Sequence, residues 1–529
     1  MTRSAWLAIW LGGALAAPAQ VSYERLERAQ EEPANWLTYS GNYLGHRHSR
    51  LAQINRQNAA RLKVSWVFQM RTLEKVETTP LVVDGVMYLT QPPNDVFAID
   101  TRTGRPVWKY QRHLPPRINV CCGQVNRGLA MLGDRLYLGT VDAHLAALDA
   151  KTGALIWDVE VADYKTGHSV TVAPLAVKDK IIVGIAGGEY GIRGFLDAYD
   201  ARTGRRLWRT YTIPGPGEFG NNTWSGDSWK TGGAPTWTPG SFDPDLNLIY
   251  WGTGNPGPDW NGDVRLGDNL YSDSVLALDA DTGKIRWYFQ FTPHDLHDWD
   301  ATQVPVLVDA EFRGRQRKLM LFANRNAFYY VLDRQSGEFL HGAPFAKQTW
   351  ASGLDDKGKP IRLPNTSPTD KGVLVYPGVQ GGTNWYSPSY SPATGLFYLS
   401  VWEYASIYFT GEAPYSPGNR FIGSVPQPVP HEPGWGAVRA LDPRSGRMKW
   451  EYKLYSPPQA GILSTAGNLV FGGADEGNFF ALDAETGKEL WRAQTGGVIA
   501  AGPITYLSGG KQQVAIAAGS AIFSFTLPD

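Results

Sequence analysis

Residues 481–491 read ALDAETGKELW, and this pattern recurs along the chain: a small apolar residue, an Asp, a Thr-Gly or Ser-Gly pair, and usually a Trp four residues after the Gly. The other copies are AIDTRTGRPVW (98–108), ALDAKTGALIW (147–157), AYDARTGRRLW (198–208), ALDADTGKIRW (277–287), VLDRQSGEFL (331–340) and ALDPRSGRMKW (440–450). Because Gly supplies a positive φ, and Asp and Thr side chains bond turn amides, each copy predicts a strand, a tight turn and a second strand.

The spacing of the copies indicates the architecture. The shortest interval, Trp450 to Trp491, leaves room for about four short strands, the size of a propeller blade rather than of a helical repeat. An eighth copy, NRQNAARLKVSW (55–66), lacks the Asp and Gly and would close the ring against the last strands, 504–525. We predict an all-β, eight-bladed β-propeller with Trp-docking blade motifs, in which residues 20–529 form a single domain with a long insertion within 341–437.

Charge and the start of the chain limit its partners and location. Lys plus Arg equals Asp plus Glu at 50 each, so no charge field points to nucleic acid or an anionic membrane. Arg3, the apolar run 6–17 and Ala-Pro-Ala at 17–19 are typical of a secretory signal peptide. We therefore predict that residues 1–19 are cleaved and that the mature protein is periplasmic; an uncleaved anchor is the weaker alternative, since the apolar run is short for a membrane span.

The only two cysteines, Cys121 and Cys122, are neighbours. An exported protein meets an oxidising compartment, so a vicinal disulfide is the expected state. Such a bridge closes a very small ring and adds little through loop closure, which indicates a function rather than stabilisation. The alternative is a chance pair of buried thiols.

The segment CCGQVNRG (121–128), the repeats and several further motifs together resemble the quinoprotein methanol and ethanol dehydrogenases, which depend on pyrroloquinoline quinone (PQQ). The resemblance covers nearly the whole mature chain. It implies that the vicinal disulfide lies on one face of the quinone and Trp237 on the other. It also implies a set of polar contacts to PQQ from Glu77, Arg127, Thr171, Gly187, Gly188, Arg325 and Asn384. Two positions depart from the family pattern: Ala186 stands where a Ser is frequent, and Gln459 lies near the position of a frequent Trp.

The same resemblance implies a metal bound beside the quinone by Glu189, Asn255 and Asp298. Their oxygen ligands suit a hard cation. For each of these residues, the alternative to metal binding is a structural role in a turn or a position in a solvated corner. Asp300 would add a third carboxylate if the segment is extended, and lanthanide-dependent members of the family have Asp there, so we expect a lanthanide ion, with calcium as the alternative. Otherwise, Asp300 points into a turn. For His294 and His297 we expect turn and supporting roles.

The resemblance further implies a mechanism in which Asp298 takes the hydroxyl proton of an alcohol while hydride passes to metal-bound PQQ. Arg325 matches the cationic residue beside the quinone oxygens and is the second predicted catalytic residue. The sequence contains no Cys-x-x-Cys-His motif, so a separate soluble cytochrome c is the expected electron acceptor.

The substrate is expected to be a small primary alcohol, but the sequence does not choose among alcohols. The long stretch between Leu340 and Trp450 either covers the mouth of the propeller or decorates its outer edge. Two other functions are open: a PQQ-dependent polyol or sugar dehydrogenase, and a non-catalytic propeller scaffold. Nothing in the sequence decides between a monomer and a homodimer.

Overall fold

The computed structural model describes residues 20–528, and it is built almost entirely of strands. The predicted signal peptide, 1–19, lies outside the described residues. The helices are short: α1 (Tyr23–Glu27) and the 3-10 turns η1 (Ala29–Glu31), η2 (Ala59–Arg61), η3 (Tyr164–Thr166), η4 (Gly188–Tyr190), η5 (Asn221–Thr223) and η6 (Ser228–Thr231). Among residues 20–528, no helix has the length and apolar character needed to cross a bilayer. The predicted all-β class is confirmed.

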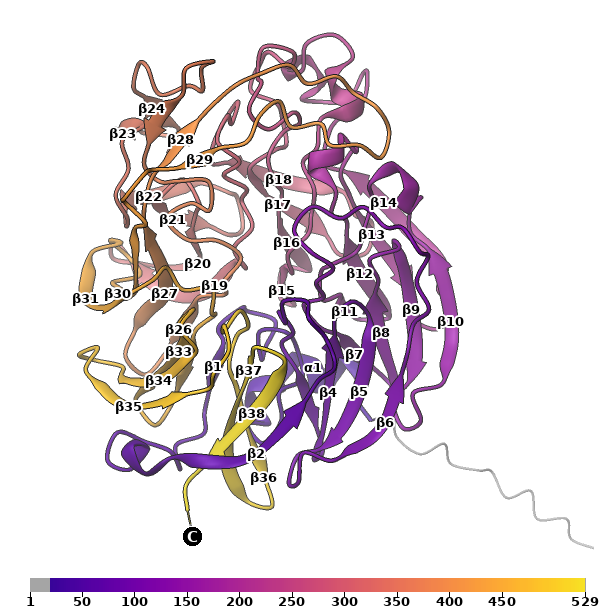
Figure 1. The fold of residues 1–529 in the computed structure, drawn as a ribbon, viewed down its shortest axis with the longest axis vertical. Helices are drawn as coiled ribbons and strands as arrows, with labels where there is room; N and C mark the ends of the chain where they lie inside the picture. Colours follow the sequence, from indigo (N-terminus) through magenta and orange to yellow (C-terminus); the bar gives the residue numbers. More distant parts are fainter. Residues whose placement is uncertain (1–19, 529) are drawn as a thin grey trace, which may run out of the picture.

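Within the described chain, eight sheets have four or five strands, and in Figure 1 they are arranged around a common centre, as in a β-propeller. In chain order, the first four comprise β2 (Lys63–Gln69) with β36 (Ile504–Ser508), β37 (Lys511–Ala518) and β38 (Ala521–Thr526); β3 (Leu81–Val83), β4 (Val86–Gln91), β5 (Asp95–Asp100) and β6 (Pro106–Tyr110); β7 (Ala130–Leu132), β8 (Arg135–Gly139), β9 (His144–Asp149) and β10 (Leu155–Glu160); and β11 (Leu175–Val177), β12 (Lys180–Gly184), β13 (Phe195–Asp200) and β14 (Arg206–Tyr211).

The second four comprise β15 (Ser241–Asp243), β16 (Leu248–Gly252), β17 (Ser274–Asp279) and β18 (Ile285–Gln290); β19 (Val306–Phe312), β20 (Arg315–Ala323), β21 (Phe328–Asp333) and β22 (Phe339–Pro344); β26 (Ser389–Ser391), β27 (Leu396–Glu403), β30 (Trp435–Leu441) and β31 (Met448–Leu454); and β32 (Leu463–Thr465), β33 (Leu469–Gly473), β34 (Asn478–Asp483) and β35 (Glu489–Gln494), joined by β1 (His48–Ser49).

The repeated motif forms the turn between the last two strands of a sheet. Between β34 and β35, Asp483 Oδ1 accepts hydrogen bonds of 3.0 Å from the amides of Glu485 and Thr486 and from the Thr486 hydroxyl. Gly487 follows at φ 72°. The local Asp, Thr and Gly therefore set the turn, as the sequence predicts.

The Trp that ends each motif docks on the motif turn of the next sheet. Trp450 Nε1 donates to the carbonyl of Ala484 at 3.0 Å, and a Cβ at Gly487 would lie 2.6 Å from the Trp450 ring. The same indole-to-carbonyl bond joins four further pairs: Trp66 to Thr101 (2.8 Å), Trp108 to Ala150 (3.1 Å), Trp287 to Arg334 (3.2 Å) and Trp491 to Leu62 (3.1 Å). In the copy without a Trp, the Tyr329 hydroxyl donates instead to the Pro443 carbonyl at 2.7 Å.

One sheet combines an early strand of the chain with its last three strands. Strand β2 pairs antiparallel with β38, with Val67 opposite Phe523, and the two strands lie side by side in purple and yellow in Figure 1. The predicted pairing of the segment ending at Trp66 with the last strands is confirmed. In β-propellers, a sheet that combines an early strand with the last strands of the chain joins the beginning of the ring to its end.

Two small sheets lie in the long segment between β22 and β30: β23 (Ala351–Leu354) with β24 (Pro360–Arg362), and β25 (Val373–Val375) with β28 (Ser406–Tyr408) and β29 (Gln427–Pro428). Part of this segment returns to the centre of the molecule. The Phe421 amide donates to the Glu189 carbonyl at 2.7 Å, and Asn119 Nδ2 donates to the Gly418 carbonyl at 3.0 Å. These contacts favour a cover over the central loops rather than an outer-edge decoration.

Candidate active site

A cavity of about 330 Å³ lies among loops contributed by most of the sheets. That volume is within the usual range of a small-molecule site. Most of the predicted site residues line it: Glu77, Cys121, Cys122, Arg127, Thr171, Gly187, Glu189, Trp237, Asp298, Asp300, Arg325 and Asn384. Gly188 and Asn255 do not line the cavity. They lie directly behind it, since a Cβ at Gly188 would be 3.7 Å from Asn255 Oδ1.

The site residues occupy connections rather than strands. Glu77 lies before β3, the Cys pair and Arg127 before β7, Thr171 before β11, Trp237 before β15, and Asp298 and Asp300 before β19. Each connects one sheet to the next. Repetition of the sheet around a centre therefore brings short polar segments from distant parts of the sequence together, on a scaffold that fixes their ends.

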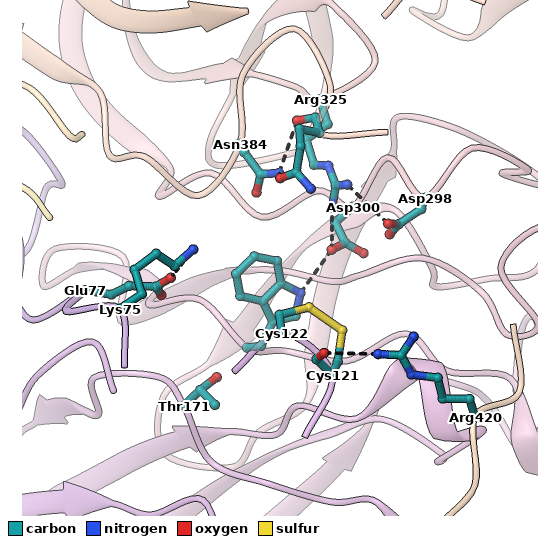
Figure 2. The surroundings of a disulfide bond; sticks show 12 residues. Lys75, Glu77, Cys121, Cys122, Thr171, Asp298, Asp300, Arg325, Asn384 and Arg420 are labelled. Carbon is teal, nitrogen blue, oxygen red and sulfur yellow. Dashed lines mark hydrogen bonds and ion pairs between the residues drawn. A yellow bond between two sulfur atoms is a disulfide. The ribbon is translucent and has the colours of Figure 1, made fainter. Parts of the chain in front are cut away.

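Cys121 and Cys122 form a disulfide, as predicted. A Glu189 carboxylate oxygen and the two sulfur atoms lie within 4.8 Å of one another. Arg420, from the segment that covers the loops, donates to the Cys121 carbonyl at 3.4 Å (Figure 2). The sulfur bridge thus forms part of the cavity wall beside a carboxylate.

Arg127 is held in a cage of polar and aromatic groups. Its Nη2 lies 2.7 Å from Glu77 Oε2, and its Nη1 donates to Thr171 Oγ1 at 3.0 Å. The guanidinium carbon lies 4.7 Å from the ring centre of Trp237 and 4.8 Å from that of Trp385. Lys75 Nζ lies 2.9 Å from Glu77 Oε1. Two cations therefore share one carboxylate at this end of the cavity, which leaves positive charge for an anionic ligand.

Gly187 is required by its surroundings. Its φ is 124°, and a Cβ there would lie 2.2 Å from the carbonyl oxygen of Gly167. A side chain at position 187 would collide with the backbone of Gly167, so this conformation and this close approach require Gly.

Asp300 connects the predicted cofactor and metal residues. Its Oδ1 accepts from the Asn255 amide, and its Oδ2 accepts from Trp237 Nε1 at 3.0 Å and from Arg325 Nη1 at 2.8 Å. It lines the cavity and does not cap a turn of its own segment. The alternative in which Asp300 points into a turn is therefore wrong.

Asp298 lies next to Arg325, with Oδ2 3.4 Å from Nη2, and both side chains point toward each other in Figure 2. Its backbone is in the left-handed region, at φ 62°, which is uncommon for a residue with a side chain and is frequent at functional sites. Arg325 is thus shared between Asp298 and Asp300.

Burial and mutual repulsion oppose the ionisation of the carboxylates in the site. Burial, with a smaller contribution from the charge of Asp300, raises the pKa of Glu189 to about 7. Burial also raises the pKa of Asp298 well above its usual range; Arg325 opposes this shift, while Asp300, Asp259 and Glu189 add to it. A buried carboxylate cluster with one neighbouring guanidinium calls for another cation. The oxygen ligands suit a hard metal ion.

The two departures from the family pattern both line the cavity. Ala186 offers no hydroxyl there. Gln459 accepts from Lys75 Nζ at 3.2 Å and donates to Asp475 at 3.2 Å, so it adds a polar group where an aromatic ring is frequent.

Sequence reasoning missed part of the wall. Lys75, Gln380, Trp385, Tyr386 and Trp402 line the cavity, and the rings of Tyr386 and Trp402 are stacked, with centres 5.8 Å apart. The run Asn384-Trp385-Tyr386 was a signal for two of them, because both residues directly follow the predicted contact Asn384. Lys75 and Trp402 are brought in by the fold alone.

The two histidines near the carboxylates support loops, as expected. His294 Nδ1 contacts the Gly267 carbonyl at 2.9 Å, and His297 Nε2 contacts the Thr366 carbonyl at 2.8 Å. His297 also stacks on Trp299, with ring centres 4.2 Å apart. Neither residue lines the cavity.

Comparison with known proteins agrees with this geometry. The glucose/ethanol/alcohol dehydrogenase β-propeller domain matches residues 36–344, and an outer membrane assembly factor BamB family matches residues 435–520. Quinoprotein alcohol dehydrogenase PedH of Pseudomonas putida is 40% identical over 95% of this chain and 89% of its own length. A lanthanide-dependent methanol dehydrogenase of Methylacidiphilum fumariolicum is 37% identical over 94% of this chain and 86% of its own. A solved europium-containing methanol dehydrogenase superposes with a TM-score of 0.90 at 34% identity, covering 95% of this chain and all of that one.

Proposed function

This chain belongs to the PQQ-dependent alcohol dehydrogenase family, and from that premise we propose that it is a quinoprotein that oxidises primary alcohols to aldehydes in the periplasm. One observation carries the proposal: a single cavity is lined by a vicinal disulfide, a Trp, an arginine cage and the carboxylates of Glu189, Asp298 and Asp300. A non-catalytic scaffold would not need this combination.

The residues that line the cavity are suited to bind PQQ, which is a flat polyanion. Trp237 and the Cys121–Cys122 bridge would hold the ring plane, and Arg127, Thr171 and Asn384 would bind its polar rim together with Glu77 and the backbone of Gly187 and Gly188. The volume and the surplus of positive charge around Glu77 support this assignment. When bound, the quinone accepts a hydride from the alcohol carbon.

For the metal ion we propose the ligands Glu189, Asn255, Asp298 and Asp300. All four lie in or directly behind the cavity wall, and the raised pKa values of the buried carboxylates support a requirement for a cation. Three carboxylates favour a trivalent lanthanide over divalent calcium, which is the alternative.

Asp298 is the proposed general base. It must be ionised to remove the hydroxyl proton of the alcohol, and burial opposes that state; Arg325 and a cation in the site would restore it. Arg325 Nη1 and Nη2 would also donate to negative charge that develops beside them during the reaction. The hydrophobic and aromatic wall around Trp385, Tyr386 and Trp402 would keep water from these groups.

We also infer that the eight sheets of four or five strands are the blades of one closed ring formed by residues 20–529. The pairing of β2 with β38 and the chain of Trp-to-turn contacts, ending with Trp491 on Leu62, support this count. Residues 1–19 are the proposed signal peptide. Since the chain has no haem-attachment motif, a separate cytochrome c is the proposed electron acceptor.

The test is dye-linked oxidation of ethanol by apo-protein supplied with PQQ and either lanthanum or calcium, for the wild type, Asp300→Ala and the control Asp263→Ala. Asp263 is an exposed acidic residue near the site loops. Activity with lanthanum alone, lost only in Asp300→Ala, supports the proposal. Equal activity with calcium in all three proteins removes Asp300 from the metal site and keeps the enzyme class. Absence of activity and of quinone absorbance with either metal overturns the proposal.

A further inference from the structure

Asp259 is a buried carboxylate to which the preceding assignments give no role. It lies in the connection between β16 and β17, four residues after Asn255, and its side chain is almost fully buried, at 1% exposure. Neither of its carboxylate oxygens has a hydrogen-bond partner in the described structure. Burying an unpaired carboxylate is costly, so such a group calls for a ligand.

The nearest guanidinium does not supply that partner. Arg265 Nε donates to the Pro258 carbonyl at 3.1 Å, and its Nη1 donates to Asn269 Oδ1 at 2.9 Å. Its Nη2 donates to the main-chain carbonyls of Asp259 and Asp295 at 3.2 and 2.6 Å. Arg265 therefore fixes the backbone of the loop and leaves the Asp259 carboxylate unpaired.

The loop that carries Asp259 packs against the loop that carries Glu189. A Cβ at Gly257 would lie 3.5 Å from the carbonyl oxygen of Gly188. Both loops are tied to the same covering segment: the Phe421 amide donates to the Glu189 carbonyl at 2.7 Å, and the Trp260 amide donates to the Ile422 carbonyl at 3.0 Å. Two consecutive residues of one segment thus hold Glu189 and the neighbour of Asp259.

The electrostatic couplings place Asp259 with the same carboxylates. Burial, together with the charges of Glu189 and Asp300, raises the pKa of Asp259 well above its usual range, and the side chain of Asn255 and the charge of Arg265 oppose the shift. In turn, Asp259 raises the pKa of Asp298. Glu189, Asp259, Asp298 and Asp300 are therefore four mutually repelling carboxylates. Arg325 lies beside Asp298 and Asp300, and Arg265 is the guanidinium that interacts with Asp259.

We propose that Asp259 is an additional carboxylate of the metal site, behind Asn255, and that it increases the preference of the site for trivalent over divalent cations. This inference rests on the proposed function. An ionised carboxylate attracts a trivalent ion more strongly than a divalent ion at the same distance, and Asp259 adds one such charge to those of Glu189, Asp298 and Asp300. The Asp259 carboxylate either binds the ion through its own oxygen or orients the side-chain amide of Asn255, which binds the ion. Both effects depend on the negative charge of Asp259.

The experiment measures metal binding directly. Apo-protein with saturating PQQ is titrated with terbium, whose luminescence is sensitised by nearby tryptophans, and the bound terbium is then displaced by lanthanum or by calcium. The proteins are the wild type, Asp259→Asn, which keeps the shape and removes the charge, and Asp263→Asn, which removes an exposed charge from the same loop. Thermal unfolding is recorded for each protein, and Asp259→Ser is a second variant should Asp259→Asn not fold.

The expected result is that Asp259→Asn lowers the ratio of lanthanum to calcium affinity by about tenfold or more, whereas Asp263→Asn leaves it unchanged. An unchanged ratio in Asp259→Asn, with PQQ and terbium still bound, overturns the role of Asp259 and keeps the proposed function. Binding of PQQ without terbium by the wild type overturns the metal site, and binding of neither overturns the proposed function together with this inference.

Discussion

The indole nitrogen of Trp237 donates a hydrogen bond of 3.0 Å to Asp300 Oδ2. The residue proposed to stack on PQQ is thereby tied to the carboxylate proposed to select the metal ion. Because Arg325 and the Asn255 amide bind the same carboxylate, a change at the ring face is transmitted to the metal site through one side chain. Cofactor and metal binding are expected to depend on each other here.

Replacing Trp237 by Phe and by Ala separates its two contributions. Trp237→Phe keeps an aromatic face and loses only the hydrogen bond, so PQQ affinity should fall by no more than about threefold. Trp237→Ala removes the ring and should lower the affinity by about tenfold or more, since a stacked ring contributes about 1 kcal/mol beyond its buried area. Fluorescence quenching during PQQ titration with lanthanum measures both. Equal losses in the two variants would show that the hydrogen bond, not the ring, holds the cofactor.

Removing the disulfide should affect cofactor binding more than stability. The bridge joins adjacent residues, so its loop-closure contribution is only about 1 kcal/mol. The double variant Cys121→Ser, Cys122→Ser should therefore unfold within a few degrees of the wild type, yet bind PQQ about tenfold more weakly because one wall of the cavity loses its fixed surface. Thermal unfolding and PQQ titration on the same samples test this. A large drop in unfolding temperature with unchanged PQQ affinity would contradict it.

Docking of Trp450 on the next motif turn predicts a sharp steric limit at Gly487. A Cβ there would lie 2.6 Å from the Trp450 ring, at φ 72°. Gly496, at φ 78°, has no atom within 4 Å of the corresponding position and is the matched control. Gly496→Ala should cost roughly 1 kcal/mol from backbone conformation alone, and Gly487→Ala roughly 1–3 kcal/mol more from the clash. Denaturant unfolding of the two variants measures the difference, and equal midpoints would reject Trp docking as a constraint.

His46 should make the fold sensitive to acid. Burial, together with the charge of Arg334, lowers its pKa from 6.5 to about 4, although its contact with the Leu307 carbonyl partly opposes the shift. Below pH 6.5 the unfolded chain therefore takes up a proton that the folded chain refuses until about pH 4. Stability should fall as pH decreases through this window, by roughly 3 kcal/mol for the one residue at the acid end.

The variant His46→Gln removes that titration while keeping a side-chain donor. Its unfolding temperature should depend less steeply on pH between 4 and 6.5 than that of the wild type, and the exposed His113→Gln is the control. Four other buried or partly buried histidines also have pKa values lowered to about 4 and will leave a residual slope: His48, His168, His294 and His297. Parallel pH profiles for wild type and His46→Gln would show that His46 does not contribute.

The parts of the fold predicted from the sequence are those whose causes are local. Asp483, Thr486 and Gly487 form their turn through hydrogen bonds between residues two to four apart, and the same residues recur, so the turn and its flanking strands follow from the pattern. The pairing of β2 with β38 could also be predicted, because an incomplete first copy and leftover final strands have to share a sheet. The site residues matched by motif nearly all line one cavity for a related reason: they occupy connections between sheets, as Trp237 does, or between strands of one sheet, as Glu189 and Arg325 do, in a repeated architecture.

What the sequence did not indicate depends on the packing of segments without a common motif. Lys75 and Trp402 line the cavity because loops from different sheets converge, and Asn255 lies behind the wall rather than on it. The covering segment reaches Glu189 and Cys121 through Phe421 and Arg420, which no periodicity could place.

The sequence by itself determined the repeated turn, the all-β class and the family, since these rest on short-range hydrogen bonding, glycine conformation and motifs read along the chain. The tertiary structure alone decided which carboxylates share one buried volume. In the sequence, Asp259 resembles any polar loop residue. Its ionised form becomes unfavourable only when folding buries it near Glu189 and Asp300, because the free energy of a carboxylate depends on its solvation and on neighbouring charges rather than on its place in the chain.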